Sequence, residues 1–344
     1  MNTNTSNFPC HTTDVVVIGA GPVGLFAVFE CGMLGMSCHV IDALESLGGQ
    51  CAALYPEKPI YDIPAHPVLE AGQLIENLIS QIEPFDPVYH LNQQAVFMKE
   101  DGADGWCVTT TTGTQIRAKA VVIAAGVGAF GPNRPPLDGL ADYEGTSVFY
   151  MVRRRDDFKG KRLVIAGGGD SAVDWAVSLA DVAEKIYVVH RRDKFRAAPE
   201  TVRRMHELAE QGDVVEIVTP YQLGALHGRD GIMTALEVTD FDGGSRMLEA
   251  DILLPFFGLA SKIGPIADWQ LELQQNHIVV DPSTCETNRA GIFAVGDIAC
   301  YKNKLKLILT GFSEAATAAH AIHPRVFPGQ ALHFEYSTSK GVPL

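Results

Sequence analysis

Two glycine clusters in this chain have the spacing that binds the phosphates of a dinucleotide. In the first, four apolar residues lead into Gly19, Gly21 and Gly24. Gly19 permits a tight turn, Gly21 allows the backbone to approach a pyrophosphate, and Gly24 allows the next helix to pack on the strand. The free amides at the start of that helix attract phosphate oxygens. Asp42 ends the next apolar run, about 20 residues on, where an acid binds ribose hydroxyls in such folds.

The second cluster repeats this order: a strand at 161–166, a G-x-G-x-x-A turn, a helix at 172–180 and a strand at 185–189. A basic run follows that last strand in place of an acid. Arginine offers a fixed fork of donors that suits a 2′-phosphate, so the run predicts NADP(H). The alternative is a solvated basic strand end, which does not explain three arginines and a lysine within residues 191–196 of an acidic chain. The residues predicted to bind NADP(H) are Gly167, Gly169, Asp170, Ser171, His190, Arg191, Arg192 and Arg196.

The composition sets limits on the function. The chain has 344 residues, 47% of them hydrophobic and 20% charged, which is ordinary for a soluble globular protein of one or two domains. A formal net charge of −14 argues against nucleic-acid binding. The polar N-terminus is unlike a secretory signal, and no apolar run is long enough to span a bilayer. We therefore expect a cytoplasmic protein without a nucleic-acid or membrane partner.

The seven cysteines include no C-x-x-C pair. An odd number without a signal sequence does not suggest a disulfide framework, so we expect reduced thiols. We also expect no metal site.

The elements that position the glycine clusters predict an α/β protein with two Rossmann-like, three-layer ββα dinucleotide-binding domains. Apolar periodicity predicts a helix at 71–82, and alternation predicts antiparallel strands at 95–98 and 106–110. A buried strand is expected at 118–126, and a last helix from about Gly311. The second unit (131–259) is inserted into the first (1–130 and 260–344), which ends in a tail at about 325–344.

Three segments resemble the FAD contacts of two-dinucleotide-fold flavoproteins: the first glycine turn, residues 124–126 and residues 294–297. The inserted domain, with its basic run at 190–197, is similar to that of the thioredoxin reductases. The redox dithiols of such enzymes are missing, however. Residues 148–155 hold no C-x-x-C, and Pro56 stands where glutathione-reductase-like enzymes have the partner of Cys51. Dithiol–disulfide exchange is therefore excluded.

The remaining motifs identify the chain as a member of the ferredoxin–NADP(+) reductases of thioredoxin-reductase type. They are Gly-Gly-Gln at 48–50, Leu-Tyr-Pro-Glu-Lys at 54–58, Tyr-Asp at 61–62, an unbroken match over 167–176, and Tyr336 followed by Ser-Thr-Ser. The resemblance implies hydride transfer between NADPH and FAD and single-electron transfer between FAD and ferredoxin or flavodoxin. It also implies a homodimer.

The resemblance implies roles for single residues. Tyr55 and Tyr336 cover the two faces of the flavin, although both could be ordinary core residues, and no side-chain acid or base is required. Tyr336 must move, or nicotinamide must insert beside it, so the C-terminal tail is predicted to gate turnover. The N-terminus of the last helix, near 310–313, is predicted to stabilise negative charge on the flavin. The implied FAD ligands are Gly19, Gly21, Gly24, Asp42, Gln50, Tyr55, Val96, Phe130, Asp297 and Thr338.

Other functions stay open. An NADPH-dependent flavin reductase could use flavodoxin, a quinone or ferric iron, because an acceptor touches mainly the surface. A flavin monooxygenase is disfavoured, since residues 158–160 lack the expected histidine. A non-catalytic FAD/NADPH redox sensor is the third alternative. Candidates for docking an acidic ferredoxin, or simply solvated charges, are Arg153, Arg154, Arg155, Lys159, Lys302, Lys304 and Lys306.

Overall fold

A computed structural model describes residues 9–102, 105–330 and 341, with the backbone alone at 129–132 and 259–262. The chain divides into two compact units. Unit 1 contains residues 1–129 and 261–344, and unit 2 contains residues 130–260. The two connecting segments, β11 (Ala129–Pro132) and β19 (Leu259–Lys262), pair with each other as a two-stranded sheet.

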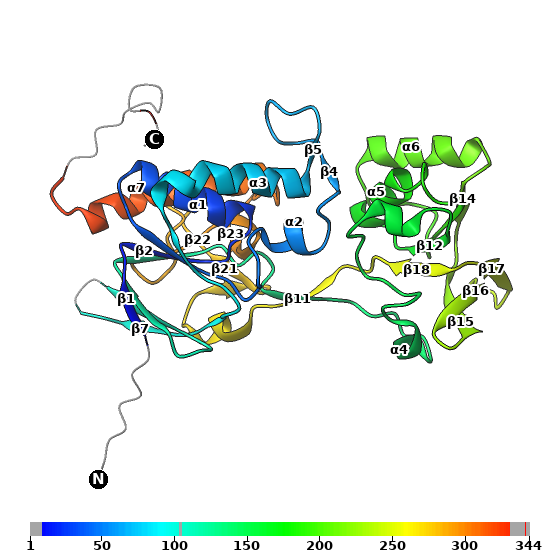
Figure 1. Cartoon of the computed structure of the whole chain (residues 1–344), viewed down its shortest axis with the longest axis horizontal. Helices are drawn as coiled ribbons and strands as arrows, with labels where there is room; N and C mark the ends of the chain where they lie inside the picture. Colours follow the sequence, from blue (N-terminus) through cyan, green and yellow to red (C-terminus); the bar gives the residue numbers. More distant parts are fainter. Residues whose placement is uncertain (1–8, 103–104, 331–340, 342–344) are drawn as a thin grey trace, which may run out of the picture. The chain divides into compact units, whose positions relative to one another are not determined.

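Unit 1 has three layers, drawn in Figure 1. Its central five-stranded sheet is parallel throughout and has the order β22 (Ile292–Ala294), β10 (Ala120–Ile123), β2 (Val15–Ile18), β3 (Cys38–Ile41), β6 (Val88–His90). Helices α1 (Pro22–Met33), α3 (Ala71–Ile82) and α7 (Ile308–Val326) pack on one face. The second sheet lies against the other face and has the order β1 (Cys10–Thr12), β9 (Gln115–Ala118), β8 (Trp106–Thr110), β7 (Ala95–Glu100).

Alternation along β2 explains the layering. Successive side chains of a strand point to opposite faces. Val15 and Val17 belong to the core under the helices, whereas Val16 and Ile18 belong to the core between the two sheets. This is the expected three-layer ββα arrangement. The smaller elements of unit 1 are α2 (Gly49–Ala53), β4 (Pro59–Ile60), β5 (Leu69–Glu70), η1 (Glu83–Phe85), η3 (Gly264–Asp268), β20 (Leu273–Gln274), β21 (His277–Val279), η4 (Gly296–Ile298) and β23 (Ala299–Cys300).

The helix expected at 71–82 and the antiparallel pair β7–β8 are confirmed. Helix α7 differs, because it begins at Ile308 and not near Gly311. Gly311 lies inside its first turns, where a Cβ atom would come within 2.3 Å of Val23 Cγ2. The glycine is there for close packing on α1, so it does not mark the start of the helix.

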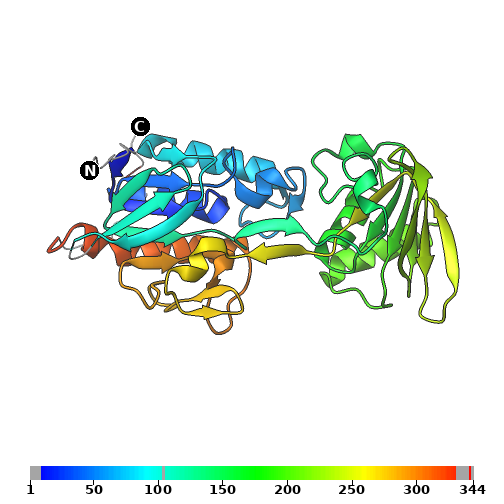
Figure 2. The same cartoon turned by 90° about the horizontal axis from the view of Figure 1, so that it is seen from below.

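Unit 2 repeats the plan on a smaller scale. Its four-stranded parallel sheet has the order β14 (Val215–Val218), β13 (Lys185–Val189), β12 (Arg162–Ala166), β18 (Ile252–Pro255). An antiparallel sheet, β15 (Gln222–Arg229), β16 (Ile232–Thr239) and β17 (Ser245–Glu249), packs on it and is yellow-green in Figure 2. The helices are α4 (Leu140–Tyr143), η2 (Arg155–Phe158), α5 (Asp170–Ser178) and α6 (Pro199–Glu210).

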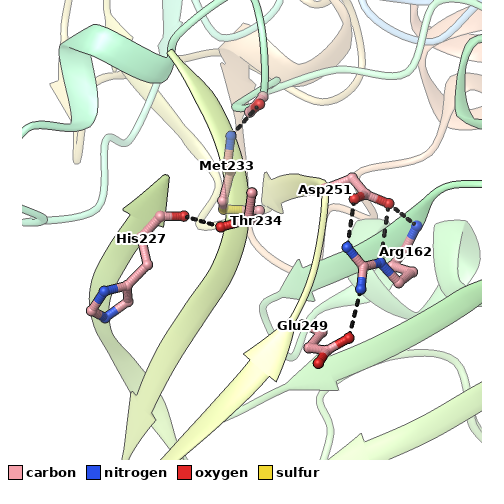
Figure 3. A network of polar contacts seen from close by, with 7 residues as sticks. Arg162, His227, Met233, Thr234, Glu249 and Asp251 are labelled. Atoms are coloured by element: carbon pink, nitrogen blue, oxygen red, sulfur yellow. Dashed lines mark hydrogen bonds and ion pairs between the residues drawn. The ribbon is translucent and has the colours of Figure 1, made fainter. Parts of the chain in front are cut away.

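Helix α5 begins two residues before the expected position 172. Gly169 is its N-cap and Asp170 lies in the first turn, where a carboxylate interacts well with the helix dipole. Figure 3 shows how the sheet edge of this unit is fixed. The Arg162 guanidinium donates to both Asp251 (2.8 Å) and Glu249 (2.8 Å), which ties β12 to the segment before β18.

Candidate functional site

The first glycine turn is closed toward the protein and open at one residue. Gly19 has φ +110°, and a Cβ atom there would lie 2.3 Å from the Ala124 carbonyl oxygen. A Cβ atom at Gly24 would lie 1.9 Å from the Gly19 carbonyl oxygen. At Gly21, the N-cap of α1, a Cβ atom would meet nothing within 4 Å. The turn therefore has the shape of a pyrophosphate cradle, with free space above Gly21 at a helix N-terminus.

The Asp42 side chain is hydrogen-bonded to this turn. Its Oδ2 accepts a hydrogen bond from the Ala20 amide at 2.6 Å, and its Oδ1 accepts one from the Leu44 amide at 2.8 Å. Burial raises the pKa of the carboxyl, and the two amide hydrogen bonds act in the opposite direction. A carboxylate oxygen has two lone pairs, so a ribose hydroxyl can still be bound. Sequence reasoning missed the brace that Asp42 provides to the turn.

Helix α2 brings Gln50 to the same place. The Gly48 amide donates to the Ala20 carbonyl at 2.8 Å. A Cβ atom at Gly49 would lie 3.0 Å from Gly21 Cα, and one at Gly126 would lie 3.5 Å from Gln50 Nε2. The loop after β10, the first glycine turn and α2 thus converge around Gly21.

The Cys51 thiol in α2 and the Tyr55 hydroxyl just after that helix each affect the pKa of the other. Burial raises the pKa of the Cys51 thiol to about 11. Burial also raises the pKa of the Tyr55 hydroxyl, and the nearby Asp297 carboxylate adds to both shifts. Lys58 Nζ lies 5.6 Å from the Tyr55 ring centroid. Tyr55 and Asp297, distant in sequence, are therefore within electrostatic range of each other in unit 1.

Asp297 lies in η4, directly after Gly296, whose φ is +73°. The Gly296 amide donates to Glu314 Oε2 at 2.7 Å. Glu314 also accepts from Lys304, whose side chain is only 6% exposed. The expectation that Lys304 contributes to a docking surface is wrong, because its ammonium is buried against Glu314.

The other implied FAD residues are less fully described. Val96 is half-buried in β7, at a register irregularity between Ala95 and Phe97. Phe130 lies in β11, where the backbone alone is described. Tyr336 and Thr338 lie outside the described residues.

The second glycine turn has the same construction in unit 2. Gly167 has φ +151°, and a Cβ atom there would lie 2.6 Å from the Phe256 carbonyl oxygen. Gly169 is open, with nothing within 4 Å of a Cβ position. Asp170 Oδ1 accepts from the Ala198 amide at 2.9 Å, and Ser171 is exposed on the first turn of α5.

The predicted basic run lies beside this turn. The Arg196 amide donates to the Gly168 carbonyl at 2.6 Å, and the side chains of Arg191, Arg192 and Arg196 are exposed. The His190 ring fills the space over Gly168, where a Cβ atom would come within 2.3 Å of it. Burial and the charges of Arg191 and Arg192 lower the pKa of His190. The middle glycine of the Gly-Gly-Gly sequence was the available signal for this ring.

The seven cysteines, all at described positions, are free thiols. Within the described ranges, no three histidine, cysteine or acidic side chains are grouped so that they could hold a metal ion. The helices of the described part of the chain include none with the length and apolar character needed to cross a membrane.

Comparisons with known proteins agree with this construction. The family model described as pyridine nucleotide-disulphide oxidoreductase matches residues 13–321. A protein of Acidiphilium cryptum named ferredoxin–NADP reductase is 62% identical over 333 residues, covering 96% of this chain and 98% of the relative. One of the same name from Rhodospirillum rubrum is 59% identical over 334 residues, covering 96% of each.

Among solved structures, Lactococcus lactis thioredoxin reductase superposes with a TM-score of 0.78 at 22% identity, covering 92% of this chain and 99% of that one. The fold is thus that of the thioredoxin reductases. The matches confirm the resemblance drawn from the motifs. The chain belongs to the pyridine nucleotide-disulphide oxidoreductase family and, within it, to the ferredoxin–NADP reductases of thioredoxin-reductase type.

Proposed function

We propose that this chain is an FAD-dependent oxidoreductase that moves electrons between NADP(H) and ferredoxin. In the balanced reaction, two reduced ferredoxins, NADP⁺ and a proton give two oxidised ferredoxins and NADPH. The observation that carries the proposal is the pair of glycine turns, each open at one residue, Gly21 in unit 1 and Gly169 in unit 2. Identity near 60% to proteins named ferredoxin–NADP reductase supports the choice of partner.

Unit 1 is the proposed FAD-binding domain. The amides at the start of α1 and the space above Gly21 would hold the pyrophosphate, and Asp42 the adenosine ribose. Gln50 would lie along the cofactor, with Asp297 at its ribityl or pyrophosphate part. Bound FAD would supply the redox chemistry, exchanging a hydride with nicotinamide and single electrons with an iron–sulfur protein.

The remaining unit 1 residues would shape the flavin pocket. Tyr55 would lie against one face of the flavin and Tyr336 against the other. Val96 and Phe130 would line the site, and Thr338 would lie near the ring. Orientation is the main contribution of these side chains, because the cofactors carry the reaction.

Unit 2 is the proposed NADP(H)-binding domain. The space above Gly169 and the start of α5 would hold the pyrophosphate, and Gly167 makes the turn that shapes it. Arg191, Arg192 and Arg196 would bind the 2′-phosphate. His190 would hold the turn through its contact with Gly168. The Asp170 hydrogen bond to Ala198 keeps the basic run beside the turn.

The thiols have no part in this reaction. Cys51 lies in α2, next to Gln50 of the proposed flavin site, but a pKa of about 11 keeps it protonated at neutral pH. Electrons would pass directly from the flavin to an external partner. Lys302 and Lys306 of unit 1, and Arg153, Arg154 and Lys159 of unit 2, are exposed and remain the candidates for docking an acidic ferredoxin. We further propose a homodimer and a cytoplasmic location.

Three measurements test the proposal on the purified full chain. The first is the visible spectrum, which should show bound flavin. The second compares NADPH with NADH as reductant, and NADPH should be strongly preferred. The third compares cytochrome c reduction with and without ferredoxin. Ferredoxin should stimulate the rate, and a rate unchanged by ferredoxin would favour a flavin reductase with another acceptor.

A double substitution tests the predicted preference for NADPH over NADH. Arg191→Ala/Arg192→Ala should raise the KM for NADPH about tenfold or more while leaving that for NADH nearly unchanged. An equal change for both nucleotides would contradict the role given to these arginines. Glu207→Gln is a suitable control, because it changes an exposed charge on α6 that pairs within its own helix.

A further inference from the structure

Glu314 is an acidic side chain in the core of unit 1, with 4% of its surface exposed. It accepts three hydrogen bonds from a different part of the chain. The Gly296 amide donates to Oε2 at 2.7 Å, the Tyr301 hydroxyl donates to Oε1 at 2.7 Å, and the Lys304 ammonium donates to Oε1. A buried ion pair of this kind is weak evidence for stability, since an apolar pair of similar volume is often equally good.

The carboxylate of this ion pair is also the hydrogen-bond acceptor of the Gly296 amide. A buried amide without an acceptor is costly, so this N–H must be paired. Gly296 has a positive φ and packs against Val23 of α1, where a Cβ atom added to the glycine would lie 3.4 Å from the valine side chain. Gly311 of α7 packs on the same valine and on Gly296 Cα. The start of α1, the turn before Asp297 and the start of α7 therefore meet at one point.

The next residue along the chain from Gly296 is Asp297. The charge of its carboxylate is near enough to Cys51 and Tyr55 to raise the pKa of each. Because Gly296 directly precedes Asp297 in η4, a shift of the Gly296 backbone would move the Asp297 carboxylate with it. Glu314 is the group that holds this peptide, and Lys304 offsets the negative charge that Glu314 brings near Asp297.

We propose that Glu314 is a positioning residue for the flavin site. Its carboxylate fixes the Gly296 amide and thereby the position of Asp297. Lys304 holds the Glu314 carboxylate in place through their ion pair. This inference rests on the proposed FAD site of unit 1. Neither residue is among those proposed above to bind the cofactor. The role of Lys304 is thus internal to unit 1.

Two double variants separate hydrogen bonding from the ion pair. Glu314→Gln/Lys304→Met removes both charges and keeps a carbonyl oxygen that can accept from the Gly296 amide. Glu314→Leu/Lys304→Met removes both charges and takes the acceptor away from the Gly296 amide and from the Tyr301 hydroxyl. Both avoid the unpaired buried charge that a single substitution would create, so both should fold.

The readout is the rate at which the holoenzyme releases FAD, followed by the rise in flavin fluorescence on dilution. We expect release from the Gln/Met variant close to that of the unaltered protein, and release from the Leu/Met variant about tenfold faster. The visible circular dichroism of the bound flavin should change only in the Leu/Met variant. Arg289→Ala is the control for lost stability, because Arg289 contacts Trp106 and Glu100.

The outcomes distinguish the two proposals. If the unaltered protein holds no FAD, the proposed function fails. If it holds FAD and the two double variants release it at the same rate, Glu314 has no positioning role and the ion pair is merely structural. If Arg289→Ala speeds release as much as the Leu/Met variant, the effect comes from stability and the inference is overturned.

Discussion

The carboxylate of Asp42 accepts a hydrogen bond from the amide of Ala20 at 2.6 Å, so the acid that directly follows β3 holds the glycine turn that follows β2. The same side chain bonds the Leu44 amide at 2.8 Å. A single residue thus joins two neighbouring strand ends, and its effect on cofactor binding is partly through the backbone.

Asp42→Ala should lower both stability and FAD affinity. The substitution leaves two part-buried amides without an acceptor, which costs about 1–3 kcal/mol. Asp42→Asn keeps one carbonyl oxygen and should fall between Asp42→Ala and the unaltered protein. Thermal unfolding with and without added FAD measures the two effects. If Asp42→Ala left the unfolding temperature without FAD unchanged, the brace would be unimportant.

Gly21→Ala and Gly24→Ala should behave in opposite ways. A Cβ atom at Gly21 meets nothing within 4 Å, so the apoprotein should fold normally and lose FAD affinity as the methyl group enters the phosphate space. A Cβ atom at Gly24 lies 1.9 Å from a carbonyl oxygen, so that variant should lose about 3 kcal/mol of stability or more. Circular dichroism on heating and FAD titration separate the two. Equal losses of FAD affinity at equal stability would contradict the distinction.

Stability should fall in mild acid because of a buried histidine pair. His39 Nδ1 lies 3.0 Å from His90 Nε2, and burial lowers the pKa of His39 to about 4. An unfolded histidine binds its proton near pH 6.5. Between pH 6.5 and about 4, the unfolded state therefore binds more protons, and stability is lost as the pH falls.

The measurement is the unfolding temperature from about pH 7 to about pH 4.5, which spans most of that window. His39→Gln should lessen its fall with pH, and His66→Gln, which changes an exposed histidine, should leave the fall as it is. If His39→Gln followed the pH dependence of the unaltered protein, the pair would not cause it.

The Arg162–Asp251 ion pair should contribute modestly to the stability of unit 2 (Figure 3). Its hydrogen bonds hold the pKa of the Asp251 carboxyl below the ordinary value. The stabilisation should therefore persist above the ordinary aspartate pKa and disappear as the pH falls through the lowered one. Asp251→Ala should cost about 1 kcal/mol, since both side chains are partly exposed. Denaturant unfolding monitored in unit 2 checks this, with FAD release as the property expected not to change.

Local patterns in the sequence were enough to predict the strand–turn–helix units and the helix at 71–82. Their signals are short in range: apolar alternation, apolar residues at helical spacing, and glycines that only one kind of turn requires. The sequence places the start of the last helix near Gly311, three residues late, because nothing local shows that this glycine is packed against Val23 inside the helix. The position of α7 depends on that tertiary contact.

Lys304 shows a second limit of prediction from the sequence, namely the direction in which a charged side chain points. Three lysines at alternate positions suggest a basic surface, and nothing local indicates that the middle one turns inward. Its partner, Glu314, lies in α7 and is brought to it by the fold. Asp42 was found as an acid at the right place, but its bond to Ala20 depends on the register between β2 and β3. The contact of the His190 ring with Gly168 likewise depends on the tertiary fold and has no local sequence signal except the glycine itself.

The pairing of β11 with β19 also bears on how the chain folds. β22 must pair with β10, although the whole of unit 2 separates them in sequence. Closing so long a loop slows folding, because its entropy is lost before the contact forms. Once unit 2 has folded and β11 has paired with β19, the ends of that loop are already neighbours. We therefore expect the inserted unit to act as a folding nucleus for its host, so that early-folding contacts in unit 2 govern how fast β22 joins the sheet of unit 1.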